Sequence, residues 1–129
     1  MPKFSQRSLQ RLKTCHPDLQ KLFEEVIKTY DCTIQEGHRS NERQEQLFDE
    51  DKTKLRAGQS KHNKTPSIAV DVAPYPTDWQ DHKAFIFFAG YVFATADKLG
   101  ISIRWGGNWD GDSEFNDQKF NDYPHFELK

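Results

Sequence analysis

Apolar residues recur at helical spacing in the first part of the chain. Between residues 17 and 30 they follow the i, i+3, i+4, i+7, i+8 and i+11 pattern, which lines one face of a helix. They are Leu19, Leu22, Phe23, Val26, Ile27 and Tyr30. Pro17 suits the first helical position, where its missing N–H costs nothing. The pattern predicts an amphipathic scaffold helix.

A second helical pattern begins after Asp78 or Asp81, either of which can cap a helix. Its wide apolar face consists of Phe85, Phe88, Ala89, Val92, Phe93, Ala96 and Leu99. Gly100 then provides a C-terminal stop. Ser5 or Ser8 can cap a short first helix, and Ser40 a further helix that carries Gln44, Leu47 and Phe48.

The segments between these helices have the composition of strands and loops. Short apolar runs predict strands at residues 32–36, 68–73, 101–105 and 124–128. Residues 51–66 and 106–123 are polar and predict exposed loops. The chain of 129 residues is the right length for one domain. We therefore expect a single α+β domain, residues 1–129, with a small antiparallel sheet flanked by helices.

Charge and composition exclude several classes of function. The formal net charge is −2, and no basic stripe is present to attract nucleic acid. No segment approaches the ~20 apolar residues that span a bilayer, and the N-terminus has no apolar signal region. We expect a cytoplasmic protein, a monomer, that neither binds nucleic acid nor inserts into a membrane. Cys15 and Cys32 are too few and too far apart for a metal site, and we expect free thiols.

His62, Asp71 and His125 stand out as possible metal ligands. Each alone is unremarkable, since most histidines are surface or core residues. Together, however, two imidazoles and one carboxylate form the ligand set of a catalytic zinc site, whose fourth position is open to water. Asp71 lies within an apolar strand, so it is a carboxylate in a buried setting. Asp122, three residues before His125, is placed to accept a proton from an attacking water.

Two segments of the sequence resemble the signature segments of the LAS-type zinc metallopeptidases. The first runs from Ser60-Lys61-His62 to Ala69-Val70-Asp71, and the second is Asp122-Tyr123-Pro124-His125. That group contains D-Ala-D-Ala carboxypeptidases and phage L-alanyl-D-glutamate endolysins, and it shares a fold with hedgehog-type domains. The resemblance covers about residues 36–129.

The resemblance implies a role for each matched residue. His62, Asp71 and His125 would bind Zn²⁺, and Asp122 would be the general base. Arg39, in Gly37-His38-Arg39, would stabilise the oxyanion, with an ordinary surface ion pair to Glu36 or Glu42 as the alternative. Ser60 would support the substrate or the geometry of a ligand. One departure is the spacing of His62 and Asp71, which is 71 − 62 = 9 positions and longer than in many relatives. Since a longer loop costs little closure entropy, the ligands are still expected to meet.

Other polar residues near these segments have open interpretations. Glu127 lies two residues from His125 on the same strand face and is expected to support that ligand or to be a surface carboxylate. The acidic residues of 106–122 lack the spacing of an EF-hand calcium loop. The aromatic residues of this region could wall a substrate cleft or bury the loop; they are Trp105, Trp109, Phe115 and Phe120.

The resemblance implies a zinc peptidase that acts on the peptidoglycan stem peptide. The absence of an export signal favours a phage-type endolysin, which reaches the cell wall after the membrane is permeabilised, and cleavage between L-Ala and D-Glu. A D,D-carboxypeptidase is the first alternative; it would need a cation for the substrate's terminal carboxylate, such as Arg56 or Lys61. A non-catalytic zinc domain and a metal-dependent nuclease using His62 and Asn63 are the others.

Overall fold

A computed structural model describes residues 2–107 and 122–129 of the chain. The α-helices are α1 (Gln6–Leu12), α2 (Pro17–Val26), α3 (Asn41–Asp49) and α4 (His82–Leu99), and a short 3₁₀ helix, η1, spans Lys61–Asn63. The strands are β1 (Cys32–Glu36), β2 (Ala69–Pro74), β3 (Ile103–Gly106) and β4 (Asp122–Leu128). The predicted α+β class is confirmed.

The four strands form one antiparallel sheet in the order β1-β2-β4-β3. Its register places Asp71 of β2 between two polar residues of the neighbouring strands. Glu36 of β1 is opposite Asp71 on one side, beyond a register shift, and His125 of β4 is opposite it on the other. The sheet thus carries a row of three ionisable side chains across three strands.

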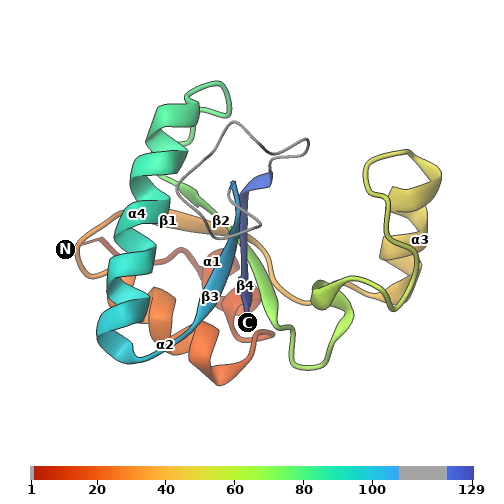
Figure 1. Cartoon of the computed structure of the whole chain (residues 1–129), viewed down its shortest axis with the longest axis horizontal. Helices are drawn as coiled ribbons and strands as arrows, with labels where there is room; N and C mark the ends of the chain where they lie inside the picture. The colour runs from red at the N-terminus through yellow and green to blue at the C-terminus, as the bar shows by residue number, and fades with distance from the viewer. Residues whose placement is uncertain (1, 108–121) are drawn as a thin grey trace.

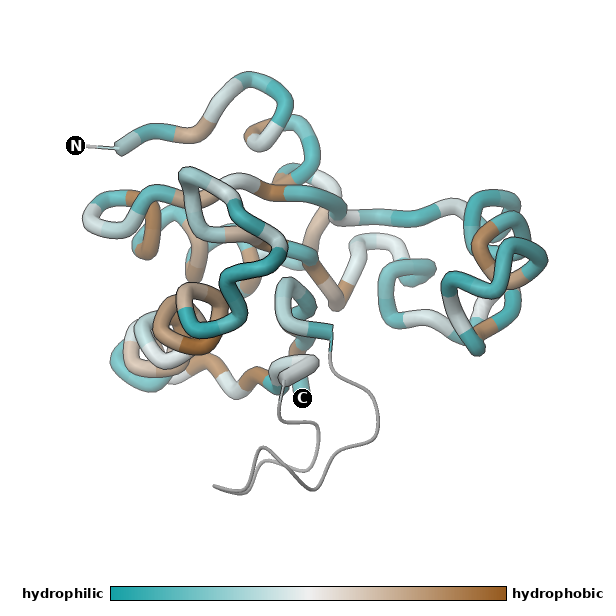
Figure 2. Tube along the Cα trace, turned by 90° about the horizontal axis from the view of Figure 1, so that it is seen from above, coloured by the Kyte–Doolittle hydropathy of each residue, from teal (hydrophilic) through white to brown (hydrophobic). Residues whose placement is uncertain are grey.

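The core lies between the sheet and the two long helices (Figure 1). Helices α2 and α4 contact each other, and α4 also contacts β2, β3 and β4. Three buried aromatic rings meet there: Phe126 of β4 packs edge-on against Phe23 of α2 and Phe88 of α4, with centroids 5.7 and 6.1 Å away. Figure 2 shows the hydrophobic residues gathered in this part of the molecule. The core therefore supports the strands that carry Glu36, Asp71 and His125.

Residues 41–59, which we call the arm, stand apart from the sheet (Figure 1). The arm consists of α3 and the segment that follows it. Ser40 caps α3 by accepting a hydrogen bond from the backbone N–H of Arg43. Most of the arm is hydrophilic and exposed, and Figure 2 shows it projecting from the body of the protein.

Most predicted elements are confirmed, with differences at their ends. Helix α2 stops at Val26 and turns follow, although Tyr30 still packs against the core. Strand β4 begins at Asp122 rather than at residue 124. The prediction of an exposed loop over 51–66 is wrong at its end, because Ser60 and His62 are buried. The Ser60 capping box that begins η1 folds this polar segment inward.

Two further expectations concern the membrane and the cysteines. Among the helices of the described residues, none has the length and apolar character that a bilayer crossing requires. Cys15 and Cys32 are free and buried, and burial raises their pKa values to about 11 and about 12. The thiols are therefore protonated at neutral pH, as expected for core residues.

Candidate metal centre

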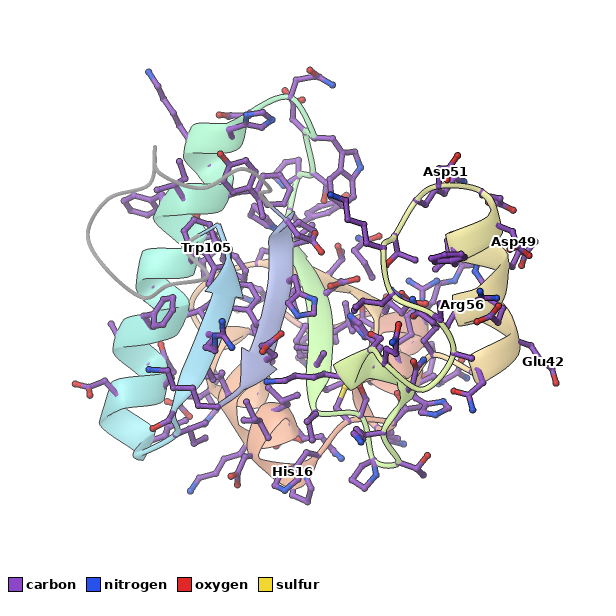
Figure 3. All side chains as sticks on the ribbon, turned by 45° about the vertical axis from the view of Figure 1, so that its right-hand side comes forward. His16, Glu42, Asp49, Asp51, Arg56 and Trp105 are labelled. Carbon is purple, nitrogen blue, oxygen red and sulfur yellow. The ribbon has the colours of Figure 1, made fainter. Side chains whose placement is uncertain are left out.

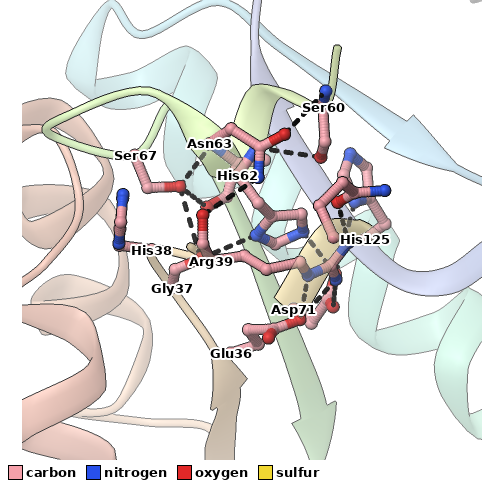
Figure 4. Close-up of polar contacts among 12 residues, drawn as sticks. Glu36, Gly37, His38, Arg39, Ser60, His62, Asn63, Ser67, Asp71 and His125 are labelled. Atoms are coloured by element: carbon pink, nitrogen blue, oxygen red, sulfur yellow. Dashed lines mark hydrogen bonds and ion pairs between the residues drawn. The ribbon is translucent and has the colours of Figure 1, made fainter. Parts of the chain in front are cut away.

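The three predicted metal ligands meet at one point of the structure. Asp71 and His125 are cross-strand neighbours on β2 and β4, and η1 brings His62 beside them. The His62 Nε2 and His125 Nδ1 atoms are each 3.3 Å from Asp71 Oδ1. One ligand atom from each residue lies within 4.8 Å of the others. This spacing suits a single ion bound by all three, as Figure 4 illustrates.

Two of these atoms are buried without a hydrogen-bond partner among the described residues. They are His62 Nε2 and Asp71 Oδ1, which face each other. Buried polar atoms are nearly always paired, because an unpaired one costs about 1–3 kcal/mol. A cation between the three side chains would satisfy both atoms. The residues present therefore fit a divalent metal, and two imidazoles with one carboxylate match zinc.

Neighbouring groups orient the His62 ring. Its Nδ1–H donates to the carbonyl oxygen of Gly37 at 2.7 Å, which directs Nε2 toward Asp71. The backbone N–H of His62 donates to Ser60 Oγ at 3.1 Å. Such partners fix the tautomer of a metal-binding histidine. Ser60 thus positions a ligand, and its predicted contact with substrate stays a prediction.

Gly37 occupies a position where a side chain would not fit. A Cβ atom there would lie 2.3 Å from Thr14 Oγ1 and 2.4 Å from the carbonyl oxygen of Arg11. Both residues belong to the end of the first helix and the turn after it. Close packing of this segment against the end of β1 therefore sets the carbonyl that orients His62.

A second set of contacts orients His125. Its Nε2–H donates to Glu127 Oε1 at 2.8 Å, which leaves Nδ1 facing Asp71. The other oxygen of Glu127 is 2.6 Å from the ammonium of Lys61. Despite its burial, these two partners lower the pKa of Glu127 to about 2. Glu127 is thus buried and contacts His125, and its support of a metal ligand stays a prediction.

The protonation of the ligand groups follows from their mutual contacts. Burial acts to raise the pKa of Asp71, but the imidazoles of His125 and His62 outweigh it and hold that pKa well below its usual range. Burial acts to lower the pKa of His125, yet Asp71 and Glu127 raise it to about 9. Without a metal, the cluster therefore favours a carboxylate beside a protonated imidazole.

Asp122 lies at the start of β4, three residues before His125. Its Oδ2 atom is 3.9 Å from His125 Nδ1, and its side chain is 36% exposed. Burial and the charge of Asp71 raise the pKa of Asp122. A carboxyl group with a raised pKa, next to but outside the triad, is suited to accept a proton from water.

Arg39 approaches the centre from the side of β1. Its guanidinium donates from Nε and Nη2 to Glu36 and from Nη1 to Gln44 Oε1, the last at 2.9 Å. Its Nη2 atom is 3.9 Å from Asp71 Oδ2. The side chain is 12% exposed, so the ion pair with Glu36 lies largely within the protein, and the role of Arg39 in stabilising an oxyanion stays a prediction.

Gln44 is a contributor that sequence reasoning missed. It is fully buried, accepting from Arg39 and donating its amide to the carbonyl oxygen of Leu55 at 2.7 Å. Gln44 thereby ties the arginine to the arm. Only its position on the predicted helix, five residues after Arg39, could have drawn attention to it.

A cleft of about 670 Å³ lies between the metal centre and the arm. Its lining includes Arg39, Ser60, His62, Asp122 and His125 on the side of the centre. Its volume is within the range of small-molecule sites, roughly 300–1,000 Å³. The five residues border one space, so a peptide in the cleft would reach all of them.

Some predictions fall outside this description. The calcium hypothesis for 106–122 and the proposed roles of Trp109, Phe115 and Phe120 rest on residues 108–121, which lie outside the described residues. Trp105 is buried and donates its indole N–H to the carbonyl oxygen of Tyr123 at 2.7 Å. This tryptophan therefore belongs to the core and not to a cleft wall.

Comparison with known proteins agrees with the geometry of the centre. The whole chain, residues 1–129, matches the family described as phage L-alanyl-D-glutamate peptidase. It is also 30% identical over 121 residues to the L-alanyl-D-glutamate peptidase of Escherichia phage T5, and the match covers 90% of this chain and 88% of that protein.

Two solved structures have similar folds. One is the L-Ala D-Glu endopeptidase ChiX of Serratia marcescens, with a TM-score of 0.79, 26% identity and coverage of 98% of this chain and 90% of that one. The other is the D,D-pentapeptidase VanY of a VanB-type vancomycin-resistance cassette, solved with Zn(II). It has a TM-score of 0.55 and 15% identity, with 92% of this chain and 70% of that one covered. The likeness to VanY concerns the fold alone.

Proposed function

Because this chain belongs to the phage L-alanyl-D-glutamate peptidase family, we propose that it hydrolyses the L-Ala–D-Glu bond of the peptidoglycan stem peptide with a zinc ion held by His62, Asp71 and His125. One observation carries the metal assignment. His62 Nε2 and Asp71 Oδ1 are buried, face each other and lack hydrogen-bond partners among the described residues. A cation is the group that relieves both at once.

Each protein group has a defined task in this reaction. Zinc, when bound, supplies Lewis-acid chemistry, polarising the scissile carbonyl and making water more acidic. Asp122 accepts the proton of the attacking water and can return it to the leaving amine. Arg39, held in place by Glu36 and Gln44, offers a fixed positive charge to the oxyanion. Such a donor contributes about 3 kcal/mol.

The endopeptidase activity is supported by the family, and the two cations that the sequence suggested for a carboxypeptidase are paired. A carboxypeptidase requires a cation for the terminal carboxylate of its substrate, and Arg56 and Lys61 are the candidates that the sequence offers. Arg56 is paired with Glu45 at 2.8 Å, and Lys61 with Glu127 at 2.6 Å. Both charges are thus engaged within the protein, so neither residue is free to hold a terminal carboxylate.

The reaction is tested by digesting purified peptidoglycan and identifying the new termini by mass spectrometry. We expect new amino termini on D-glutamate, loss of activity with a chelator, and recovery with Zn²⁺. Release of D-alanine alone, with the L-Ala–D-Glu bond intact, would establish the carboxypeptidase instead. A protein that cuts neither bond but still binds zinc would be the non-catalytic domain.

The role of Asp122 is tested separately from metal binding. Asp122→Asn is expected to retain zinc and to lose about 10²–10⁴-fold in kcat, the contribution of a general base. Asp97→Asn makes the same chemical change at an exposed site on α4 and should leave kcat unchanged. Near-normal turnover of the Asp122 variant would remove this residue from the mechanism.

We further propose that the enzyme acts as a phage endolysin on the cell wall of a lysing host. The support is the family and the similarity to the peptidase of Escherichia phage T5. Access to the wall would then depend on a separate protein that permeabilises the membrane. Production of the enzyme inside bacterial cells, with and without permeabilisation of the cytoplasmic membrane, tests this, because only the permeabilised cells should lyse.

A further inference from the structure

The cleft has one wall at the metal centre and the other on the arm, and the two walls differ in charge. On the side of the centre, Glu36, Asp122 and Glu127 border the cleft. On the arm, Arg43, Lys52 and Lys54 border it. Arg39 and Lys61 also border it on the side of the centre, and Asp51 on the arm, so the charges that lack a partner decide how the two walls differ.

Most charges around the cleft are neutralised by a partner within the protein. Arg39 pairs with Glu36, Lys61 with Glu127 at 2.6 Å, and Lys52 with Glu50 at 3.2 Å. Arg56, farther along the arm, is paired with Glu45 and lies over the ring of Phe48 at 4.7 Å.

Arg43 and Lys54 are the exceptions among the cations that border the cleft. Arg43 donates from Nη1 to the neutral side chain of Gln46 at 2.9 Å. Within residues 2–107 and 122–129, neither Arg43 nor Lys54 has a carboxylate partner. The arm's own acids do not fill this role: Glu42, Asp49 and Asp51 lie around its outer edge, as labelled in Figure 3. Although Asp51 also borders the cleft, it makes no ion pair with either cation.

The chemistry of the substrate provides the missing partner. In an L-alanyl-D-glutamyl peptide, one carboxyl group of D-glutamate continues the chain and the other remains free as an anion. That anion is only a few bonds from the scissile nitrogen. It would be repelled by Asp122 and by the other carboxylates of the centre, and attracted by a cation across the cleft.

We propose that Arg43 and Lys54 form a subsite on the arm for the free carboxylate of the D-glutamate residue. This inference rests on the proposed function and extends it to the recognition of the residue after the scissile bond. The guanidinium of Arg43 can form a forked pair with a carboxylate, and Lys54, which borders the same cleft, adds a second charge. Selectivity for D-glutamate over a neutral residue follows from this subsite.

Two synthetic stem peptides test the subsite. One contains L-Ala-D-Glu with its free carboxylate, and in the other this carboxylate is a primary amide. The unmodified enzyme should cut the carboxylate form with a kcat/KM about tenfold higher, as expected when one charge-assisted contact is lost. The difference should be mainly in KM, since the contact is present before the bond is broken.

Removal of the two cations should abolish this preference. The double variant Arg43→Gln, Lys54→Met is expected to cut both peptides with similar kcat/KM, close to that of the unmodified enzyme on the amide. Lys54→Glu should lower cleavage of the carboxylate form further and leave the amide form nearly unaffected. Both sites are exposed, so thermal stability and zinc content should not change.

A charge-matched control separates this subsite from the overall charge of the protein. Arg7→Gln, Lys98→Met makes the same two changes at exposed positions of α1 and α4 and should retain the full preference. Loss of the preference in this control, or its retention in the Arg43, Lys54 variant, would overturn the proposal. Equal cleavage of both peptides by the unmodified enzyme would do the same, with the peptidase function intact. If neither peptide is cut at the L-Ala–D-Glu bond, the proposed function itself fails.

Discussion

The metal centre and the arm border the same cleft, but the fold holds them very differently. The candidate ligands come from β2, β4 and η1, and the residues His62 and His125 are 2% and 8% exposed. In residues 41–59, all of which the structure describes, Gln44 is the single buried residue. One side of the cleft is thus part of the packed core, and the other is a polar projection.

This difference separates the chemistry from the recognition of substrate. Metal ligands must keep their positions to within a few tenths of an ångström, which packing and hydrogen bonds on a sheet provide. Contacts with a charged, extended peptide tolerate more movement and benefit from exposure. Arg39 belongs to both sides, because it borders the centre and is bonded through Gln44 to the arm.

The largest effect is expected from removing a metal ligand. Asp71→Ala should lose zinc and at least about a thousandfold in activity, since water is no longer activated. It should also lose the stabilisation that a bound metal adds, about 4 kcal/mol at a metal concentration 1,000 times Kd. Metal analysis and thermal unfolding with and without zinc measure both. Glu42→Ala on the arm is the matched control and should keep zinc, activity and thermal stability. A similar loss in this variant would show that the two sides of the cleft do not differ in metal binding.

The second prediction compares packing in the two regions. Phe88 is 1% exposed in the core, and Phe88→Ala should lower the free energy of unfolding by about 3–5 kcal/mol. Leu55 on the arm is 43% exposed, and Leu55→Ala should change it by no more than about 0.5 kcal/mol. Urea unfolding of both variants measures the difference. Equal losses would mean that the arm is packed as firmly as the core.

The third prediction concerns the contacts that orient His125. Glu127→Gln keeps the size of the side chain but removes the charge that Lys61 and His125 share. Zinc affinity should fall about 10–100-fold, as is typical when the partner of a metal-binding histidine is changed. Competition with a chromogenic chelator gives the affinity. Glu24→Gln, at an exposed site of α2, should have no effect, and unaltered affinity of the Glu127 variant would show that the carboxylate is dispensable.

The smallest effect is expected at Gln44, which connects Arg39 to the arm. Gln44→Leu removes the acceptor for Arg39 and the donor to Leu55, so the guanidinium loses one of its supports while zinc binding is unaffected. We expect kcat to fall about tenfold or less, which is the loss of a single hydrogen bond to a charged group. KM should change less than kcat. Gln10→Leu on the exposed face of α1 is the control, and an unchanged kcat in the Gln44 variant would show that Arg39 is held by Glu36 alone.

The sequence predicted the elements of the fold well because hydrophobic spacing determines which face of each helix and strand is buried. The strands that carry Asp71 and His125 were recognisable from their apolar runs. Their register was not, because it depends on pairing between distant segments. The alignment of Glu36, Asp71 and His125 across three strands therefore became visible only in the structure.

The sequence predicted the candidate ligands of the site, but it did not predict all of the contacts that hold them in place. The resemblance to known peptidases identified the triad, Asp122 and Arg39 by local motifs. Lys61 and Glu127, in contrast, are 127 − 61 = 66 positions apart, and their ion pair follows from the tertiary fold. Gln44 resembles any polar residue of a surface helix, and its burial depends on how the arm folds back over it.

The close fit at Gly37 has a consequence for recombination between related enzymes. Its carbonyl oxygen holds His62, and a Cβ at this position would overlap Thr14 and the carbonyl oxygen of Arg11. The end of the N-terminal helix and the turn after it therefore affect the candidate metal site through their packing against Gly37, without contributing a ligand. A chimaera that exchanges residues 1–15 can preserve each catalytic residue and still tilt an imidazole, so crossover points belong after Asn63 or before Phe4, outside this contact.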